Sequence, residues 1–203
     1  MSQSSDEQLI AEYVRGDFEA LTALFERYLK PIYQFVYRYV HNVPDAEDIT
    51  QEVFIKVWKH SRKFDQKKRF KTWIFAIAKN TALDFLKKSR SASGGKKIVP
   101  FSELEHAEGE GIGEGSMLDT LADPAPLPPE VLARADITQV LKEAVDQLPF
   151  DARTVLFLYY YDHFNFREIA ETLGQSIDTV KSRHRRALFR LKELLIKQVG
   201  EIL

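Results

Sequence analysis

Apolar side chains recur with a helical period over the first part of the chain. Between residues 6 and 88 they follow one another at intervals of three and four, which is the spacing of amphipathic helices. The stripe between Leu21 and Tyr39 includes Leu29, and Pro31 inside it predicts a kink or a local break. No segment has the alternation of a convincing β-strand. The pattern therefore predicts an all-α protein.

A turn and a basic loop divide this stretch into successive helices. The turn lies at residues 42–45, where a proline opens a helix with acidic residues in its first turn. The basic loop at residues 61–69 leads into a further helix that begins at Phe70. Together these elements predict one helical domain at residues 1–90.

Composition changes abruptly after this domain. Residues 91–130 are rich in glycine, glutamate and proline, and such a segment cannot bury enough apolar surface to offset the entropy lost on ordering. Helical periodicity returns near Pro129 and continues to the C-terminus. The sequence thus predicts two small helical domains, at residues 1–90 and 131–203, joined by a flexible acidic linker.

Residues 166–190 have the features of a helix-turn-helix. Asn165 and Glu168 form a capping-box pattern for the first helix, Gly174 supplies the positive φ of a tight turn, and Ser176 is a good N-cap for the second helix. The second helix then presents a basic face, as a helix entering a DNA major groove requires. The alternative is a plain helical hairpin with a solvated basic face. The predicted DNA contacts are Ser176, Thr179, Lys181, Ser182, Arg183, Arg185 and Arg186.

Cations and aromatic side chains alternate between Lys56 and Arg90. This stretch holds twelve lysines and arginines against two aspartates, with Phe64, Phe70 and Trp73 among them. Aromatic rings beside cations suit the unstacked bases of a single strand. The alternative is that most of these aromatics are core residues and the lysines ordinary surface. The loop at residues 61–69 is the part that we expect to be exposed and functional.

Composition excludes several other classes of function. The net charge of −1 hides a segregation of basic and acidic segments, and the absence of cysteine excludes disulfides and thiolate metal sites. The five histidines show no metal-ligand spacing, and there is no phosphate-binding glycine motif. We therefore expect neither a cofactor nor enzymatic activity. No secretory signal or membrane-length apolar run is present, so we expect a cytoplasmic protein without membrane insertion.

Three segments together resemble the sigma-70 family of bacterial RNA polymerase initiation factors, in its extracytoplasmic-function (ECF) group. DAEDITQEVFIKVWKHSRKFD is similar to region 2.2, RFKTWIFAIAKNTALDFLKKSR to regions 2.3 and 2.4, and the stretch from Leu148 to Leu195 to region 4. The resemblance covers nearly everything outside the linker. It implies a factor that binds core polymerase and promoter DNA and that pairs with an anti-sigma factor.

The resemblance also implies roles for particular residues. The region 2.2 helix would dock on the β′ clamp helices of the polymerase and region 4 on the β flap; taken alone, the polar face of that helix is an ordinary solvated face. The implied core-binding residues are Asp48, Gln51, Glu52 and Phe54. The basic loop and the helix after it would capture the non-template strand of the −10 element, and the helix-turn-helix would read the −35 element. The implied −10 contacts are Arg62, Lys63, Phe64, Phe70, Trp73 and Asn80.

Two other functions fit part of the pattern. A LuxR-type or other helix-turn-helix regulator would bind duplex operators as a dimer, but that class usually has an α/β domain, and residues 1–90 contain no βαβ pattern. An adaptor that binds polymerase or an anti-sigma factor without DNA would not need the basic face at residues 181–190. In the sigma reading, the acidic residues between 101 and 136 would lie in the basic RNA path of the polymerase and mimic RNA charge.

Overall fold

The computed structural model describes residues 4–92 and 137–202. All their regular secondary structure is helical, with no strand among these residues, so the predicted all-α class is confirmed. The predicted linker, and with it the proposed RNA mimic, lies almost wholly outside the described residues. The described residues form two compact units, one of residues 4–92 with 157–180 and one of residues 137–156 with 181–202. This grouping cuts across the predicted C-terminal domain, whose boundaries stay a prediction.

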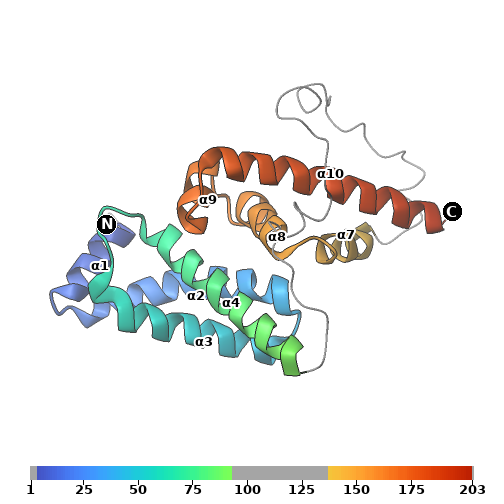
Figure 1. Cartoon of the computed structure of the whole chain (residues 1–203). Helices are drawn as coiled ribbons and strands as arrows, with labels where there is room; N and C mark the ends of the chain where they lie inside the picture. The colour runs from blue at the N-terminus through green and yellow to red at the C-terminus, as the bar shows by residue number, and fades with distance from the viewer. Residues whose placement is uncertain (1–3, 93–136, 203) are drawn as a thin grey trace. The chain divides into compact units, whose positions relative to one another are not determined.

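Four helices make up the N-terminal part of the first unit. They are α1 (Asp6–Val14), α2 (Phe18–Val40), α3 (Val43–His60) and α4 (Phe70–Ala92), and they pack side by side (Figure 1). Helix α2 continues through Pro31, so of the predicted kink or local break the break is absent, and a kink stays a prediction. The proline removes only one N–H from the ladder, and the buried stripe on both sides of it holds the helix together.

The core of this bundle consists of large side chains with almost no exposed surface. Phe35 and Phe75 meet edge to face with ring centroids 5.2 Å apart, and Phe35 contacts Tyr39 in the same way. Such pairs contribute about 0.5–1.5 kcal/mol beyond the burial of their area. The fully buried residues include Ile10, Leu24, Ile32, Phe35, Val36, Ile49, Phe70, Ile74 and Phe75.

Polar caps fix where the helices begin and end. Ser5 and Gln8 form a capping box on α1, and the side chain of Asn42 accepts a hydrogen bond from the Asp45 N–H at the start of α3. His41 ends α2 in the left-handed region, with φ of 52°. After α3 comes a 3₁₀ turn, η1 (Ser61–Lys63), and the basic loop. These caps set the lengths of α2 and α3 and so the position of the loop.

The first unit also contains the π-helical turn η2 (Phe157–Tyr161) and helix α9 (Phe166–Leu173). Helix α9 packs against α4. The second unit contains α7 (Ile137–Asp146), α8 (Phe150–Leu156) and most of α10 (Ile177–Ile202). Its core joins α8 to α10 through Leu148, Ala152, Leu156 and Ala187, with Leu188, Leu191 and Leu194 packed against them.

Candidate functional site

The basic loop before α4 is exposed, as the sequence predicts. Arg62 and Lys63 of η1 lie on the surface. Further along, the carboxylate of Asp65 accepts a hydrogen bond from the Lys67 N–H at 3.0 Å, and the Asp65 carbonyl accepts one from the Lys68 N–H at 2.9 Å. The lysines and arginines of the loop are exposed on both sides of this turn. The loop therefore presents a positive surface on an ordered backbone.

Three aromatic rings pack together, one from the loop and two from the first turn of α4. The Phe64 ring centroid lies 5.0 Å from that of Trp73 and 5.9 Å from that of Phe70. Phe70 has no exposed surface and Phe64 only 9%, whereas Trp73 is half-buried. The interpretation of Phe64 and Phe70 as DNA contacts is therefore not supported, because both rings are needed to fill the core. Trp73 is the ring of this group that reaches the surface.

Asn80 lies seven residues after Trp73, on the same face of α4, and is exposed. With Arg62 and Lys63, these two residues form what we call the loop–α4 surface. The helical period of α4 does not show which of Phe70 and Trp73 reaches the surface, because both fall within one apolar stripe. The packing of the bundle shows it, since Phe70 is buried and Trp73 is half-buried.

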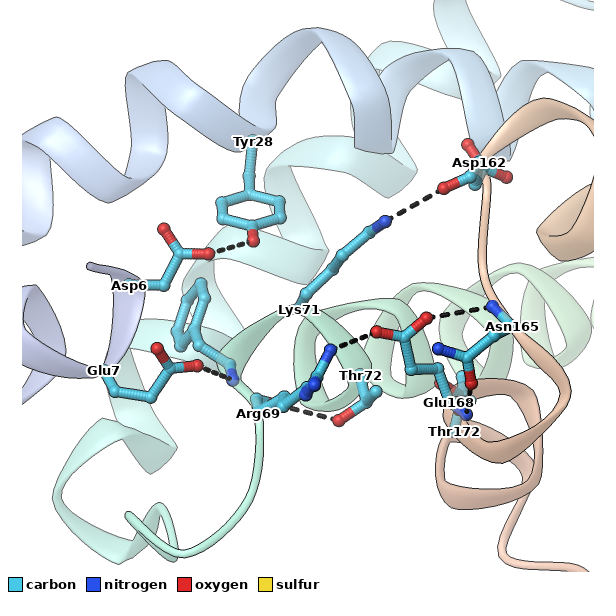
Figure 2. A network of polar contacts seen from close by, with 11 residues as sticks. Asp6, Glu7, Tyr28, Arg69, Lys71, Thr72, Asp162, Asn165, Glu168 and Thr172 are labelled. Carbon is cyan, nitrogen blue, oxygen red and sulfur yellow. Dashed lines mark hydrogen bonds and ion pairs between the residues drawn. The ribbon is translucent and has the colours of Figure 1, made fainter. Parts of the chain in front are cut away.

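Glu7 is a residue of this site that the sequence analysis missed. Its Oε1 atom accepts a hydrogen bond from the backbone N–H of Phe70 at 3.1 Å, so the carboxylate caps the N-terminus of α4 (Figure 2). Glu7 is held in place because α1 is fastened to α2: Asp6 accepts hydrogen bonds from Arg27 and from Tyr28. Burial and this bond raise the pKa of Tyr28. A cap 63 residues away in the chain leaves no local sequence signal.

Replacing Glu7 with alanine is expected to loosen the start of α4. Loss of a side-chain cap costs about 1 kcal/mol, so the free energy of unfolding should fall by that amount. Amide hydrogen exchange should accelerate at Phe70 first, since its N–H loses its acceptor. Glu7→Gln is the matched control, because it keeps the acceptor oxygen and removes only the charge. Unchanged exchange at Phe70 in Glu7→Ala would contradict the capping role.

Helix α3 exposes the polar residues that the resemblance assigns to polymerase binding. Asp48, Gln51 and Glu52 are exposed, and Glu52 forms an ion pair with Lys56 at 2.8 Å. Phe54 is only 8% exposed and its ring centroid lies 4.6 Å from that of Phe25. Phe54 thus belongs to the wall of a groove instead of projecting from the helix.

That groove lies between α2 and α3, with a volume of about 950 Å³. Its lining is mainly apolar, and two large side chains remain exposed in it, Leu29 at 56% and Ile55 at 48%. The prediction that Leu29 belongs to the buried stripe is therefore wrong. The residue lies at the edge of that stripe, where the neighbouring helix does not cover it. The lining residues are Thr22, Phe25, Glu26, Leu29, Lys30, Tyr33, Glu47, Thr50, Gln51, Phe54 and Ile55.

The predicted helix-turn-helix elements are present. Asn165 and Glu168 form a complete capping box on α9, and Gly174 ends α9 in the left-handed region with φ of 65°. The Ser176 hydroxyl accepts a hydrogen bond from the Thr179 N–H at 3.1 Å and caps the start of α10. The sequence therefore predicted the turn and both caps correctly.

The basic face of α10 is exposed at its N-terminal end. Lys181, Ser182 and Arg185 lie on the surface, together with Thr179, and Arg186 is half-buried. Arg183 is the exception. It is 6% exposed and its Nη1 atom lies 3.9 Å from Asp151 Oδ2. Arg183 therefore links α10 to α8, and its interpretation as a DNA contact is not supported.

Burial shifts the pKa values of two titratable groups, one in α10 and one in the loop before α9. Burial lowers the pKa of His184 in α10. Burial also raises the pKa of Asp162 to about 6, although Arg38, Lys71 and His163 all act to lower it. Asp162 thus lies in surroundings where the cost of desolvation exceeds the attraction of the neighbouring cations.

The part of the chain that the structure describes was searched for metal sites and membrane spans. In residues 4–92 and 137–202, no cluster of three or more histidine or carboxylate side chains could hold a metal ion. Within the same ranges, every helix is too short or too polar to cross a lipid bilayer.

Two family models match the chain. One described as Sigma-70 region 2 matches residues 24–92, and one described as Sigma-70, region 4 matches residues 138–191. The first therefore covers α3, the basic loop and α4, and the second covers the helix-turn-helix. They occur in the order that the sequence resemblance implies.

Relatives of full length are similar to the whole chain. The ECF RNA polymerase sigma factor SigW of Bacillus subtilis (strain 168) is 31% identical over 193 residues, which cover 95% of this chain and 96% of the relative. The RNA polymerase sigma-H factor of Pseudomonas aeruginosa is 29% identical over 203 residues, with coverage of 100% and 98%. The ECF RNA polymerase sigma-E factor of Escherichia coli (strain K12) is 29% identical over 204 residues, with coverage of 100% and 99%.

Two solved structures have a similar fold. That of CnrH in complex with the cytosolic domain of CnrY has a TM-score of 0.64 at 22% identity, and the match covers 96% of this chain and 99% of that one. That of the sigma factor RpoE in complex with the anti-sigma factor NepR, from Bartonella quintana, has a TM-score of 0.57 at 25% identity, with coverage of 86% and 95%.

Proposed function

The chain belongs to the sigma-70 family of RNA polymerase sigma factors, in its ECF group, and we propose that it directs promoter-specific transcription initiation. It binds core polymerase, reads the −35 element as duplex and captures the melted −10 element. The observation that supports this most strongly is the presence of two exposed basic surfaces of different kinds in one helical chain. One is the loop–α4 surface and the other is the N-terminal end of α10.

The loop–α4 surface suits a single strand better than a duplex. Trp73 offers a ring face at the edge of the core, Arg62 and Lys63 lie close by in the chain for the phosphates, and Asn80 supplies an amide on the same helix face. A base that leaves the stack can place its π-face on a ring of this kind, and hydrogen bonds to its edge then select its identity. The surface performs no covalent chemistry; binding energy favours the separated strands.

The N-terminal end of α10 suits the major groove of a duplex. Lys181 and Arg185 lie one turn apart on an exposed face, and Ser182 lies between them in the chain. Arginine and lysine pair with guanine edges or with phosphates, and the first turns of a recognition helix reach base edges. Each of these side chains therefore has the reach and the chemistry of a −35 contact.

The groove between α2 and α3 is the surface that we assign to core polymerase. It exposes apolar side chains at Leu29 and Ile55, and its charged lining residues are two acidic ones, Glu26 and Glu47, and one basic one, Lys30. A partner that projects an apolar ridge flanked by basic residues fits both properties, and the β′ clamp helices implied by the sequence resemblance are helical ridges. We assign the β flap to the C-terminal region on the same resemblance.

An anti-sigma factor is a further proposed partner. The support is the similarity to the sigma factor RpoE, whose solved structure is a complex with the anti-sigma factor NepR. The exposed apolar groove would be one surface for such an antagonist to cover, because occupying it would exclude the polymerase.

Replacing Trp73 with alanine is expected to weaken the binding of single-stranded −10 DNA. Loss of one stacked base costs about 1–3 kcal/mol, so the dissociation constant should rise roughly 5- to 150-fold. Fluorescence anisotropy with a labelled oligonucleotide measures this directly. Trp58→Ala is the matched control, since Trp58 is 55% exposed on α3 and lies outside the loop–α4 surface. Equal losses in the two variants would count against Trp73 as the stacking residue.

The function as a whole is tested by transcription with purified core polymerase on fragments of the source genome. Start sites that appear only when the chain is added, and that share upstream −35 and −10 sequences, support the proposal. A chain that binds duplex operators tightly without polymerase and produces no new start sites would instead be a helix-turn-helix regulator.

A further inference from the structure

Helix α1 packs against both elements that carry the loop–α4 surface. It contacts η1, which holds Arg62 and Lys63, and it contacts α4, which holds Trp73. The contact with α4 includes a hydrogen bond, in which the Glu7 Oε1 atom accepts from the Phe70 N–H at 3.1 Å (Figure 2). Phe70 is the first residue of α4. Glu7 therefore reaches the helical turn that carries Trp73.

The position of the Trp73 ring depends on the first turn of α4. The Trp73 N–H donates a hydrogen bond to the Arg69 carbonyl at 3.2 Å, and the Thr72 hydroxyl donates to the same carbonyl at 2.8 Å. The first N–H groups of a helix have no carbonyl within the helix to bond, so they need water or a side chain from elsewhere. Glu7 supplies that acceptor to Phe70, and its negative charge interacts favourably with the helix dipole at this end.

Two buried rings connect α1 to Trp73 by a second route. Asp6 accepts a hydrogen bond from the Tyr28 hydroxyl, and the Tyr28 and Phe70 rings meet edge to face with centroids 5.4 Å apart. The Phe70 ring centroid in turn lies 5.7 Å from that of Trp73. Tyr28 and Phe70 belong to the buried core, where close packing leaves side chains little room to move. A displacement of α1 would therefore reach Trp73 through packed side chains.

Helix α1 is itself held on the bundle by packing and by charge. The side chains that it buries are Leu9, Ile10 and Tyr13. At its N-terminal end, the Arg27 guanidinium forms an ion pair with Asp6 and donates a hydrogen bond to the Ser4 carbonyl at 3.2 Å. The Asp6 side chain is 18% exposed, so water screens this pair less than it screens a pair on the open surface. Glu7 is therefore presented to α4 by a helix that is fixed in place.

We propose that Glu7 is a positioning residue for DNA capture: by capping α4, with Asp6 as the anchor of its helix, it holds the Trp73 ring where an unstacked base can lie on it. This inference rests on the proposed function for the meaning of the loop–α4 surface. The cap and the ring contacts lie within the chain, so the position of Trp73 is measurable without DNA. Glu7 acts through Trp73 and not through a contact with the strand.

The charge of Glu7 separates this role from a simple electrostatic effect. A carboxylate beside a DNA-binding surface repels phosphates, so removal of the charge alone should tighten strand binding. Removal of the cap should weaken it, because the first turn of α4 then frays part of the time and only the ordered turn presents the ring. Glu7→Ala removes both the charge and the cap, whereas Glu7→Gln removes the charge and keeps an acceptor oxygen. The two variants should therefore change the affinity in different directions.

The affinity of the full chain for a labelled single-stranded oligodeoxynucleotide of mixed sequence tests the proposal. We expect the Kd to rise about fivefold in Glu7→Ala, the ratio that corresponds to one helix cap, and to stay equal or fall in Glu7→Gln. Asp6→Ala, which releases α1 from Arg27 and Tyr28, should also raise the Kd. Glu12→Ala is the matched control, since Glu12 lies on the same helix about 140° round from Glu7. An unchanged Kd in Glu7→Ala, or an equal rise in Glu12→Ala, would overturn the proposal.

A double-mutant cycle with Trp73 distinguishes positioning from a general loss of stability. If Glu7 acts through the ring, Glu7→Ala should leave the Kd nearly unchanged in a chain that already contains Trp73→Ala. Each variant is measured at a temperature at which circular dichroism shows it to be fully folded. A fivefold loss that persists without the Trp73 ring would show that Glu7 acts on something other than Trp73 and would contradict the positioning role.

The fluorescence of Trp73 reports its position directly. The sequence has two tryptophans, so Trp58→Phe leaves Trp73 as the single reporter. In this background we expect Glu7→Ala, but not Glu7→Gln, to increase the quenching of Trp73 by acrylamide before any DNA is added. Unchanged quenching in Glu7→Ala would overturn the proposal even if the affinity fell. If the unaltered chain bound no single strand and no transcription appeared, the proposed function would fail, while the quenching would still decide whether Glu7 fixes the ring.

Discussion

Placing two carboxylates in the α2–α3 groove, through Leu29→Glu and Ile55→Glu together, is expected to abolish most of the binding to core polymerase. Both side chains are exposed in the free chain, at 56% and 48%, so the substitutions should change the free energy of unfolding little. In the complex they would be buried in an apolar contact without a partner. Central contacts of an interface are often worth 2 kcal/mol or more each, so the affinity should fall at least about 100-fold.

The control for this double variant is Val14→Glu, an apolar position on α1 that is 41% exposed and does not line the groove. It should bind core polymerase as the unaltered chain does. Pull-down or anisotropy titration with purified core measures the loss of polymerase affinity. A mobility shift with −35 duplex DNA shows whether duplex binding through α10 is intact. Normal core affinity in the double variant would assign polymerase binding to another face.

Replacing Lys181 and Arg185 with alanine together is expected to remove most of the recognition of the −35 element. Each base-edge contact is worth about 1–3 kcal/mol, so the pair should lower promoter use by roughly 30-fold or more. Both side chains project into solvent, and the core of α10 does not depend on them. Core polymerase affinity should therefore remain unchanged.

Lys192→Ala is the control, because Lys192 is exposed on the same helix but lies two turns beyond Arg185. Its removal should have little effect on promoter choice. The salt dependence separates contacts to phosphates from contacts to base edges. Each lost phosphate contact lowers the slope of log affinity against log salt concentration by about 1. Equal loss of core binding and promoter binding in the double variant would contradict the separation of the two activities.

Local chemistry made the turn and the caps predictable. The capping box of Asn165 and Glu168, the left-handed Gly174 and the Ser176 cap of α10 all follow from residues close together in the chain. Their physical causes, unsatisfied N–H groups at a helix start and a positive φ at a helix end, act over a few residues. Such features are available to sequence analysis.

Burial was harder to predict than helix position. Phe70 and Trp73 lie in one apolar stripe, and only the packing of α4 against the rest of the bundle shows that Phe70 is fully buried. Arg183 lies among exposed cations in the sequence, but it packs toward Asp151 of α8. Leu29 follows the helical period and is nevertheless exposed. A period of 3.6 residues gives the direction of a face and leaves its edges undetermined.

The contacts across long stretches of sequence could not be predicted at all. Glu7 caps the N–H of Phe70 from 63 residues away, and Arg38 pairs with Asp162 across 124 residues. Each partner is an ordinary charged residue in its own helix or turn. The meeting of the two depends on how the helices pack, which no local pattern encodes.

The central claim is that this chain lets RNA polymerase open promoters, and that the chain itself holds the −10 element of the opened promoter as a single strand. The most direct test is permanganate footprinting of unpaired thymines on a promoter found by the transcription experiment, with core polymerase and either the unaltered chain or Trp73→Ala. We expect reactive thymines at the −10 element that depend on the chain and are reduced in the variant. A promoter that the chain occupies with polymerase but leaves fully paired would contradict the account.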